Sequence, residues 1–248
     1  MEKQIEWITA QQVNEYINEQ LKTLFLREGF EMGRQKGCLL RIKEHHIQMI
    51  CQIGFEEIKL KLIIAPAWIC HYSYHYSKNM HLKWSNRSNL SRNIYTDIAY
   101  RQRISSKIFY KKEEFFNAWD TVILPQLQEE VIGMYEKVDF DTYVLICEDG
   151  SGQNWEMGYE DGVCRNLVIG YNNFWTKQYE KGKTCLESAI LEIEERSTRA
   201  GAKDEYAQDI ENAKVILDVY GKRKTGWEEM VSDKLMSIER ATLQQYLL

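Results

Sequence analysis

The hydrophobic periodicity of the chain changes near Gly29, and this change restricts the possible folds more than any other feature of the sequence. Before Gly29, apolar residues recur at helical spacing, namely Val13, Tyr16, Ile17, Leu21, Leu24 and Phe25. Thr9 and Gln12 have the spacing of a capping box, in which each side chain accepts a hydrogen bond from the other residue's amide. The sequence therefore predicts a helix that begins after Thr9 and ends at Gly29.

After this helix the hydrophobic period falls to two. Two alternating runs, 47–53 and 58–64, flank Gly54, which predicts an antiparallel hairpin. A neighbouring strand is expected at 38–42, and a further one at 68–77, where one face carries Trp68, Cys70, Tyr72, Tyr74 and Tyr76. One-sided alternation of this kind predicts a sheet with one face covered by helices.

The middle of the chain reads as a polar loop at 85–93, two short strands at 94–100 and 104–110, and a helix at 112–137 that Pro125 should kink or divide. Asp149-Gly150 and Asp161-Gly162 are typical turn sequences. They predict a three-stranded antiparallel meander with strands at 142–147, 154–159 and 163–169.

Three helices are expected to complete the chain, at about 184–193, 206–220 and 225–238, with Thr184 as the N-cap of the first. The order of elements predicts an α+β fold: an N-terminal helix, an antiparallel sheet, a long helix, a second three-stranded group and a C-terminal three-helix segment. The expected division is a domain at 1–138 with the antiparallel sheet and a second at 139–248 with the meander and helices, which can pack as one unit.

The six cysteines stand singly, without a C-x-x-C pair, and no secretion signal or bilayer-length apolar run is present. The sequence therefore predicts a cytoplasmic protein without a membrane partner, whose thiols are reduced and mostly buried.

Charge is unevenly distributed along the chain. The formal net charge is -5, yet residues 81–112, called here the basic segment, contain eight Lys or Arg residues against only Asp97. Tryptophan, tyrosine and phenylalanine are interleaved with these cations, which suits an acidic partner. The predicted partner-binding residues are Lys83, Trp84, Arg87, Arg92, Arg101, Arg103 and Lys107. The alternative is that these charges pair within the protein or are simply solvated.

A second candidate is a polar ligand pocket on the strand face that carries His71, Ser73 and His75. Either histidine could act as a general base near neutral pH, but no orienting acid is adjacent. On a strand His71 and His75 lie roughly 13 Å apart, too far to share one zinc ion.

No sequence motif specifies a cofactor, a metal or a catalytic residue. Gly182-Lys183-Thr184 resembles the end of a phosphate-binding loop, but Lys177 occupies the required earlier glycine position. Gly182 is therefore expected in a turn. The paired carboxylates near Asp149 and Asp161 lack the spacing of a calcium loop.

The stretch LKTLFLREGF at 21–30, followed by strands at 38–42 and 47–53, resembles a bacterial family of uncharacterised α+β domains. In that family a helix ends in Gly-Phe and antiparallel strands follow directly. The resemblance covers roughly the first 75 residues. It implies an α+β fold and a bacterial intracellular setting, and it assigns no catalytic residue.

Taken together, the residues predict a non-catalytic interaction protein that binds an acidic macromolecule, either immunity-protein-like or accessory. The first alternative is a small-ligand-binding protein or hydrolase-type enzyme that uses the face with His71 and His75. The second is a nucleic-acid-binding protein, which would show steep salt dependence.

Overall fold

The structure, a computed structural model, describes residues 6–33, 37–53, 59–68, 75–76, 82–83, 90–102, 111–149, 156–157, 162–197 and 206–246. The fold is α+β, as the sequence predicts. The main sheet is antiparallel between all neighbouring strands. In spatial order its strands are β1 (Glu31–Met32), β2 (Cys38–Lys43), β3 (His46–Ile53), β4 (Lys59–Pro66), β7 (Leu90–Asn93) and β8 (Glu156–Met157).

The predicted hairpin and its neighbouring strand are confirmed. Strands β3 and β4 pair from Ile53 opposite Lys59 to His46 opposite Pro66. Strands β2 and β3 are joined by a two-residue turn at Glu44 and His45, both with positive φ, 47° and 65°. Two left-handed residues match the twist of a tight hairpin, although Asn and Gly usually occupy such positions.

The expectation that only one face of the sheet is covered is wrong, because both faces are buried. One face joins the main hydrophobic core through Leu39, Ile50, Leu60, Leu62 and Ile64. The other forms a second cluster, made of Cys38, Leu40, Ile47, Met49, Cys51, Ile63 and Ala65. A sheet buried on both faces explains why the alternation is interrupted by apolar residues at otherwise polar positions, such as Ile50 and Ile63.

The first helix, α1 (Ala10–Phe25), confirms the predicted capping box. The Gln12 amide donates to Thr9 Oγ1 at 3.2 Å, and the Thr9 amide donates to Gln12 Oε1 at 3.0 Å. A short 3₁₀ helix, Leu26–Glu28, follows and ends at Gly29, whose φ of 77° suits a residue without a Cβ.

The predicted helix at 112–137 is confirmed, but a π-helical segment divides it into two α-helices. It consists of α3 (Lys112–Ala118), a π-helical segment (Trp119–Ile123) and α4 (Leu124–Glu136). Pro125 lies in the first turn of α4, directly after the π-helical segment. Because proline lacks an amide hydrogen and its ring crowds the preceding turn, a wider turn accommodates it.

Several predicted strands are wrong. Residues predicted as a strand at 94–100 form α2 (Ile94–Arg101). Two of the predicted meander strands are helices, α5 (Phe140–Asp149) and α6 (Gly162–Trp175), and the described part of the third is strand β8. Short apolar runs rich in β-branched and aromatic residues favour strands locally, but packing against the core decides their conformation.

Two other strand and loop predictions change as well. The end of the predicted polar loop at 85–93 is strand β7, which pairs with β4 inside the main sheet. Within the predicted strand at 68–77, Trp68 lies in a turn, and only β5 (His75–Tyr76) is extended among the described residues. The predicted strand at 104–110 lies outside the residues that the structure describes.

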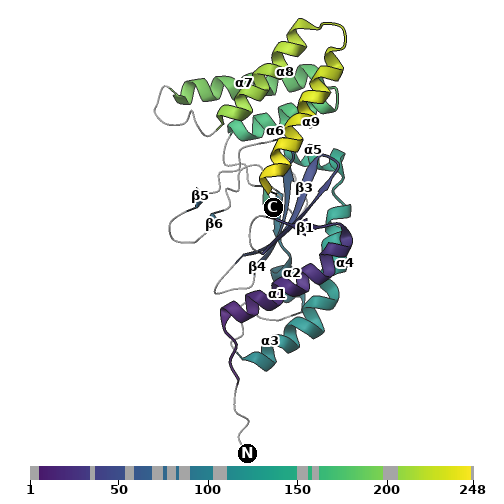
Figure 1. The fold of residues 1–248 in the computed structure, drawn as a ribbon, viewed down its shortest axis with the longest axis vertical. Helices are drawn as coiled ribbons and strands as arrows, with labels where there is room; N and C mark the ends of the chain where they lie inside the picture. Colours follow the sequence, from purple (N-terminus) through teal and green to yellow (C-terminus); the bar gives the residue numbers. More distant parts are fainter. Residues whose placement is uncertain are drawn as a thin grey trace, which may run out of the picture.

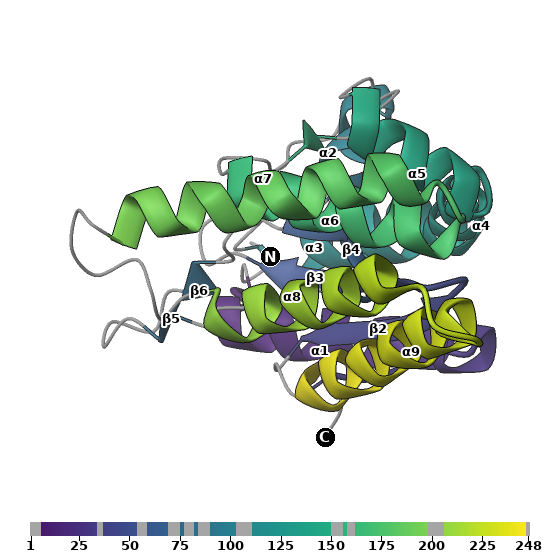
Figure 2. The same ribbon diagram turned by 90° about the horizontal axis from the view of Figure 1, so that it is seen from above.

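The three C-terminal helices are confirmed as α7 (Tyr179–Ser197), α8 (Ala207–Lys222) and α9 (Trp227–Tyr246). Thr184 is not the N-cap of α7, because the helix begins at Tyr179, five residues earlier, and Thr184 Oγ1 donates to the Glu180 carbonyl at 3.0 Å. Gly182 is therefore helical and not in a turn. Figure 2 shows α7 beside α6 and α9 beside α8.

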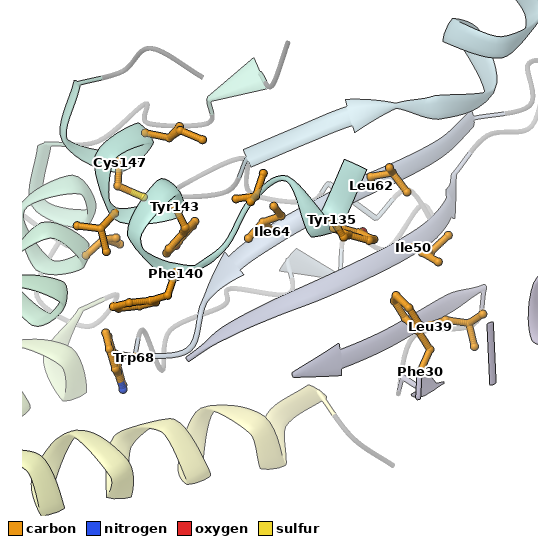
Figure 3. Packing of buried hydrophobic residues seen from close by; sticks show 14 of the residues in the cluster. Phe30, Leu39, Ile50, Leu62, Ile64, Trp68, Tyr135, Phe140, Tyr143 and Cys147 are labelled. Carbon is orange, nitrogen blue, oxygen red and sulfur yellow. The ribbon is translucent and has the colours of Figure 1, made fainter. Parts of the chain in front are cut away.

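The elements share one continuous core. In Figure 1 the sheet lies between α1–α4 on one side and α6–α9 on the other. The main hydrophobic cluster runs from Ile8 through the sheet to Ile238 in α9. Figure 3 shows its centre, where Tyr135 of α4 lies over the strands and Tyr143 and Phe140 of α5 continue the cluster toward Trp68. The core thus includes residues on both sides of the predicted boundary at 138/139.

Candidate functional site

The structure places some of the predicted partner-binding residues and leaves others outside its described ranges. Arg101 is exposed at the end of α2, and Arg92 is half-buried in β7 opposite Leu62 of β4. Lys83 belongs to β6 (Leu82–Lys83). Trp84, Arg87, Arg103 and Lys107 lie outside the described residues. The described part of the basic segment is therefore spread over separate elements and is not one loop.

Three described cations of the basic segment contact carboxylates. Arg101 forms an ion pair with Glu130 of α4. Lys111 pairs with Glu114 at 2.9 Å, and Lys112 pairs with Glu6 at 2.9 Å. The bond to Lys112 also lowers the pKa of Glu6. The two lysine pairs are solvent-exposed and add little stability, so these cations can exchange their partners easily, whereas the Glu130 side chain is only 19% exposed.

Trp7 lies against the C-terminal end of the basic segment, and sequence reasoning missed it. Its backbone forms an antiparallel bridge with Lys111, and the Lys112 amide donates to the Glu6 carbonyl at 2.9 Å. Its side chain is 64% exposed. We call Trp7, Lys111, Lys112 and Glu6 together the Trp7 edge.

A signal for this exposure was present in the sequence. Ile8 precedes the N-cap Thr9, and Val13 follows it by four residues, which is the spacing of a hydrophobic staple. Both side chains are buried in the main core. Because successive side chains in an extended segment point in opposite directions, burying Ile8 turns Trp7 outward.

The predicted histidine face is only partly described. His71 and Ser73 lie outside the described residues, and His75 is in β5. His75 pairs with Lys83 in the two-stranded β5–β6 sheet. The structure thus brings one residue of the predicted ligand face and one of the basic segment together, at a place that Figure 1 shows to one side of the main sheet.

A different histidine has the orienting carboxylate that the sequence did not provide for His71 or His75. His45, in the β2–β3 turn, contacts Glu239 of α9, with 2.7 Å between Nδ1 and Oε2. Its ring lies among aromatic rings, with centroid distances of 4.1 Å to Trp175, 5.4 Å to Trp68 and 5.7 Å to Phe140. A carboxylate on one ring nitrogen is the arrangement that orients a general base.

The neighbouring contacts give this turn a structural role. Glu44 Oε2 accepts a hydrogen bond from the Phe140 amide at 3.1 Å, at the first residue of α5. The two turn residues therefore attach the hairpin to α5 and α9 respectively. Because both side chains make these contacts, the unusual positive φ at both positions is stabilised by the surrounding structure.

His46, the next residue, is fully buried and neutral. Burial lowers its pKa to about 4. The Gln48 side-chain amide lies 3.2 Å from His46 Nε2, and His46 Nδ1 lies 3.3 Å from the Glu44 carbonyl. The ring stacks on Tyr143 of α5 at 5.4 Å. The contacts fit an uncharged ring that packs between the sheet and α5.

Within the described residues, no set of three or more His, Cys, Asp or Glu side chains is placed to hold a metal ion. No helix in the same ranges combines the length and the apolar character needed to cross a bilayer. Searches against protein-family models, curated proteins and solved structures give no match to this chain.

Proposed function

We propose that the chain is a non-catalytic interaction protein, immunity-protein-like or accessory, which binds an acidic protein through the basic segment and the Trp7 edge. The observation that carries the proposal is the exposure of Trp7 beside Lys111 and Lys112. The backbone bridge to Lys111 holds the tryptophan in place next to these cations. Tryptophan is enriched at the centre of protein interfaces, and charged side chains such as these lysines are typical of the polar rim around such a centre.

The exposure of Trp7 is unusual for this molecule. The other exposed large apolar side chains in the described residues are aliphatic, namely Leu26, Ile42, Leu145, Leu191, Val215 and Met230. Tryptophan is enriched among residues that dominate binding energies, because it buries a large rigid area. A partner that covers Trp7 would gain this area without ordering a flexible side chain.

The charges of this surface favour a protein over a nucleic acid. The cations are accompanied by the carboxylates of Glu6, Glu114 and Glu130, which would repel a phosphate backbone. An acidic protein surface also carries basic and polar groups, so it can pair with both signs of charge. The excess of positive charge in the basic segment supports an acidic partner.

The proposal predicts that charge reversal at three exposed cations strongly weakens binding. In Arg101→Glu/Lys111→Glu/Lys112→Glu, the capture of the partner from native cell extract should fall at least about tenfold, since carboxylates then face an acidic surface. The melting temperature should change by only a few degrees, because the three replaced side chains are themselves exposed.

The matched control is Lys183→Glu/Lys214→Glu/Lys222→Glu, which reverses three exposed, ion-paired cations on α7 and α8. It should bind as the wild type does. Equal loss in both variants, or full binding by the first, would contradict the proposal. Loss of the captured material after nuclease treatment would replace it with nucleic-acid binding. Empty capture by the wild type would favour the small-ligand alternative.

A further inference from the structure

Cys38 and Cys51 lie directly opposite each other on β2 and β3. Their sulfur atoms are 2.9 Å apart, and both cysteines are free. In the adjoining pair, the Gln52 amide donates to the Gly37 carbonyl at 2.8 Å. Because hydrogen-bonded and non-hydrogen-bonded pairs alternate along an antiparallel ladder, Cys38 and Cys51 form a non-hydrogen-bonded pair.

This position allows a disulfide without movement of the strands. The Cα atoms of a non-hydrogen-bonded pair are about 4.5 Å apart, which is within the range of about 4.4–6.8 Å that disulfides span. The two sulfurs already point toward each other, as their contact shows. Forming the disulfide therefore requires oxidation of the two thiols and very little movement of the strands.

The two thiols differ in access. Cys51 is fully buried, within the apolar cluster formed by Leu40, Met49 and Ile63 among others. Burial and the hydrogen bond with Cys38 raise the pKa of Cys51, which suppresses its thiolate.

Cys38 is the slightly more exposed of the two thiols. It retains 3% of its accessible surface, whereas Cys51 retains none. A small neutral oxidant such as hydrogen peroxide is therefore expected to meet the Cys38 sulfur first.

We propose that Cys38 and Cys51 are a peroxide-sensitive thiol pair, in which Cys38 reacts first and Cys51 closes the disulfide. The Cys38 sulfur attacks one oxygen of hydrogen peroxide, the O–O bond breaks, and a sulfenic acid and water are formed. The Cys51 sulfur then attacks the Cys38 sulfur and releases the second water. Two thiols lose two hydrogens in total, and one peroxide becomes two waters.

The test uses the full chain, reduced, freed of reductant and treated with hydrogen peroxide, then digested without reductant for mass spectrometry. A linked pair of peptides that contains Cys38 and Cys51 should appear, lighter by two hydrogens than its separate parts, and dithiothreitol should reverse it. Glutathione disulfide at equal concentration should give at least about tenfold less product, because it is too bulky to reach two buried sulfurs. Separate alkylation of both cysteines after peroxide treatment and unfolding would overturn the proposal.

Two single variants test the order of the steps. In Cys51→Ala, Cys38 should remain as a sulfenic acid that a cyclic 1,3-diketone labels. In Cys38→Ala, Cys51 should stay unlabelled. Labelling of Cys51 but not of Cys38 would overturn the assigned order. Cys185→Ala is the matched control, because this half-buried thiol lies outside the pair, and it should leave the linked peptide unchanged. Thermal melting of each variant confirms folding.

Discussion

Lowering the pH from 7 to 4 should reduce the free energy of unfolding by about 3 kcal/mol through His46 alone. The pKa of His46 is about 4 in the folded protein, because the ring is buried, and about 6.5 in an unfolded chain. Between these values the unfolded chain binds more protons, so stability rises with pH. This contribution is fully present above about pH 6.5 and is lost as the pH falls toward 4.

The hydrogen bonds around His46 explain why the ring resists protonation. Gln48 Oε1 accepts from Arg41 Nε at 2.8 Å, which turns the Gln48 amide nitrogen toward His46 Nε2. His46 Nε2 must therefore accept a hydrogen bond from Gln48, and His46 Nδ1 carries the proton and donates it toward the Glu44 carbonyl. A second proton on Nε2 would place two donors face to face. The nearby Lys43 and His45 also disfavour a charged ring.

The measurement is urea unfolding at several pH values for the wild type and for His46→Gln. The variant keeps a polar side chain but cannot be protonated, so its stability should fall about 3 kcal/mol less between pH 7 and 4. The Asp139 carboxylate also interacts electrostatically with His46, and the pKa of Asp139 is lowered mainly by hydrogen bonds from Thr142. The stabilising contribution of the Asp139 carboxylate is lost only as the pH falls through and below the usual aspartate pKa. Most of that loss therefore lies below the pH range in which His46 is protonated. Identical pH profiles for the two proteins would show that His46 does not titrate as described.

Replacing Gly182 with alanine should destabilise the protein by about 1–3 kcal/mol, through overpacking between α6 and α7. A Cβ at this position would lie 2.7 Å from Phe174 Cδ2, 3.0 Å from the Gly170 carbonyl oxygen and 3.1 Å from the Phe174 backbone nitrogen. Two of these atoms belong to the α6 backbone, so a side-chain rotation cannot relieve the contact. The helices would have to separate.

Gly133→Ala in α4 is the matched control. A Cβ there meets no atom within 4 Å, and alanine is the better helix former by up to about 1 kcal/mol. In urea unfolding, Gly182→Ala should thus lower the free energy of unfolding and Gly133→Ala should raise it. Destabilisation by both, or stabilisation by both, would mean that the close approach of α6 and α7 does not determine the effect at Gly182.

The elements that the sequence predicts correctly carry a local signal of their own. The capping box at Thr9, the alternation around Gly54 and the long apolar stripe after Lys112 each specify an element without reference to the rest of the chain. Residues 142–147 and 163–169 carry no such signal. Their apolar runs are too short to separate a strand from a buried helix, and contacts with the core make them helical.

The contacts between distant residues could not be predicted from one sequence. Glu239 lies 194 positions from His45, and the acidic partners of Arg101 and Lys112 come from α4 and the N-terminal segment. The close packing at Gly182 could not be predicted either, because the need for a residue without a Cβ arises only where α7 packs against α6. The exposure of Trp7, in contrast, follows from the staple pattern around Thr9 and was accessible to local reasoning.

The comparison of wild type with Trp7→Ala in partner capture tests the proposed interaction most directly. Truncation of a central interface tryptophan costs about 2 kcal/mol or more, so affinity should fall about 30-fold or more while the melting temperature stays nearly unchanged. The control is Leu191→Ala on α7, an apolar side chain of similar exposure, 60%, which should bind as the wild type does. Unchanged affinity in Trp7→Ala would contradict the account.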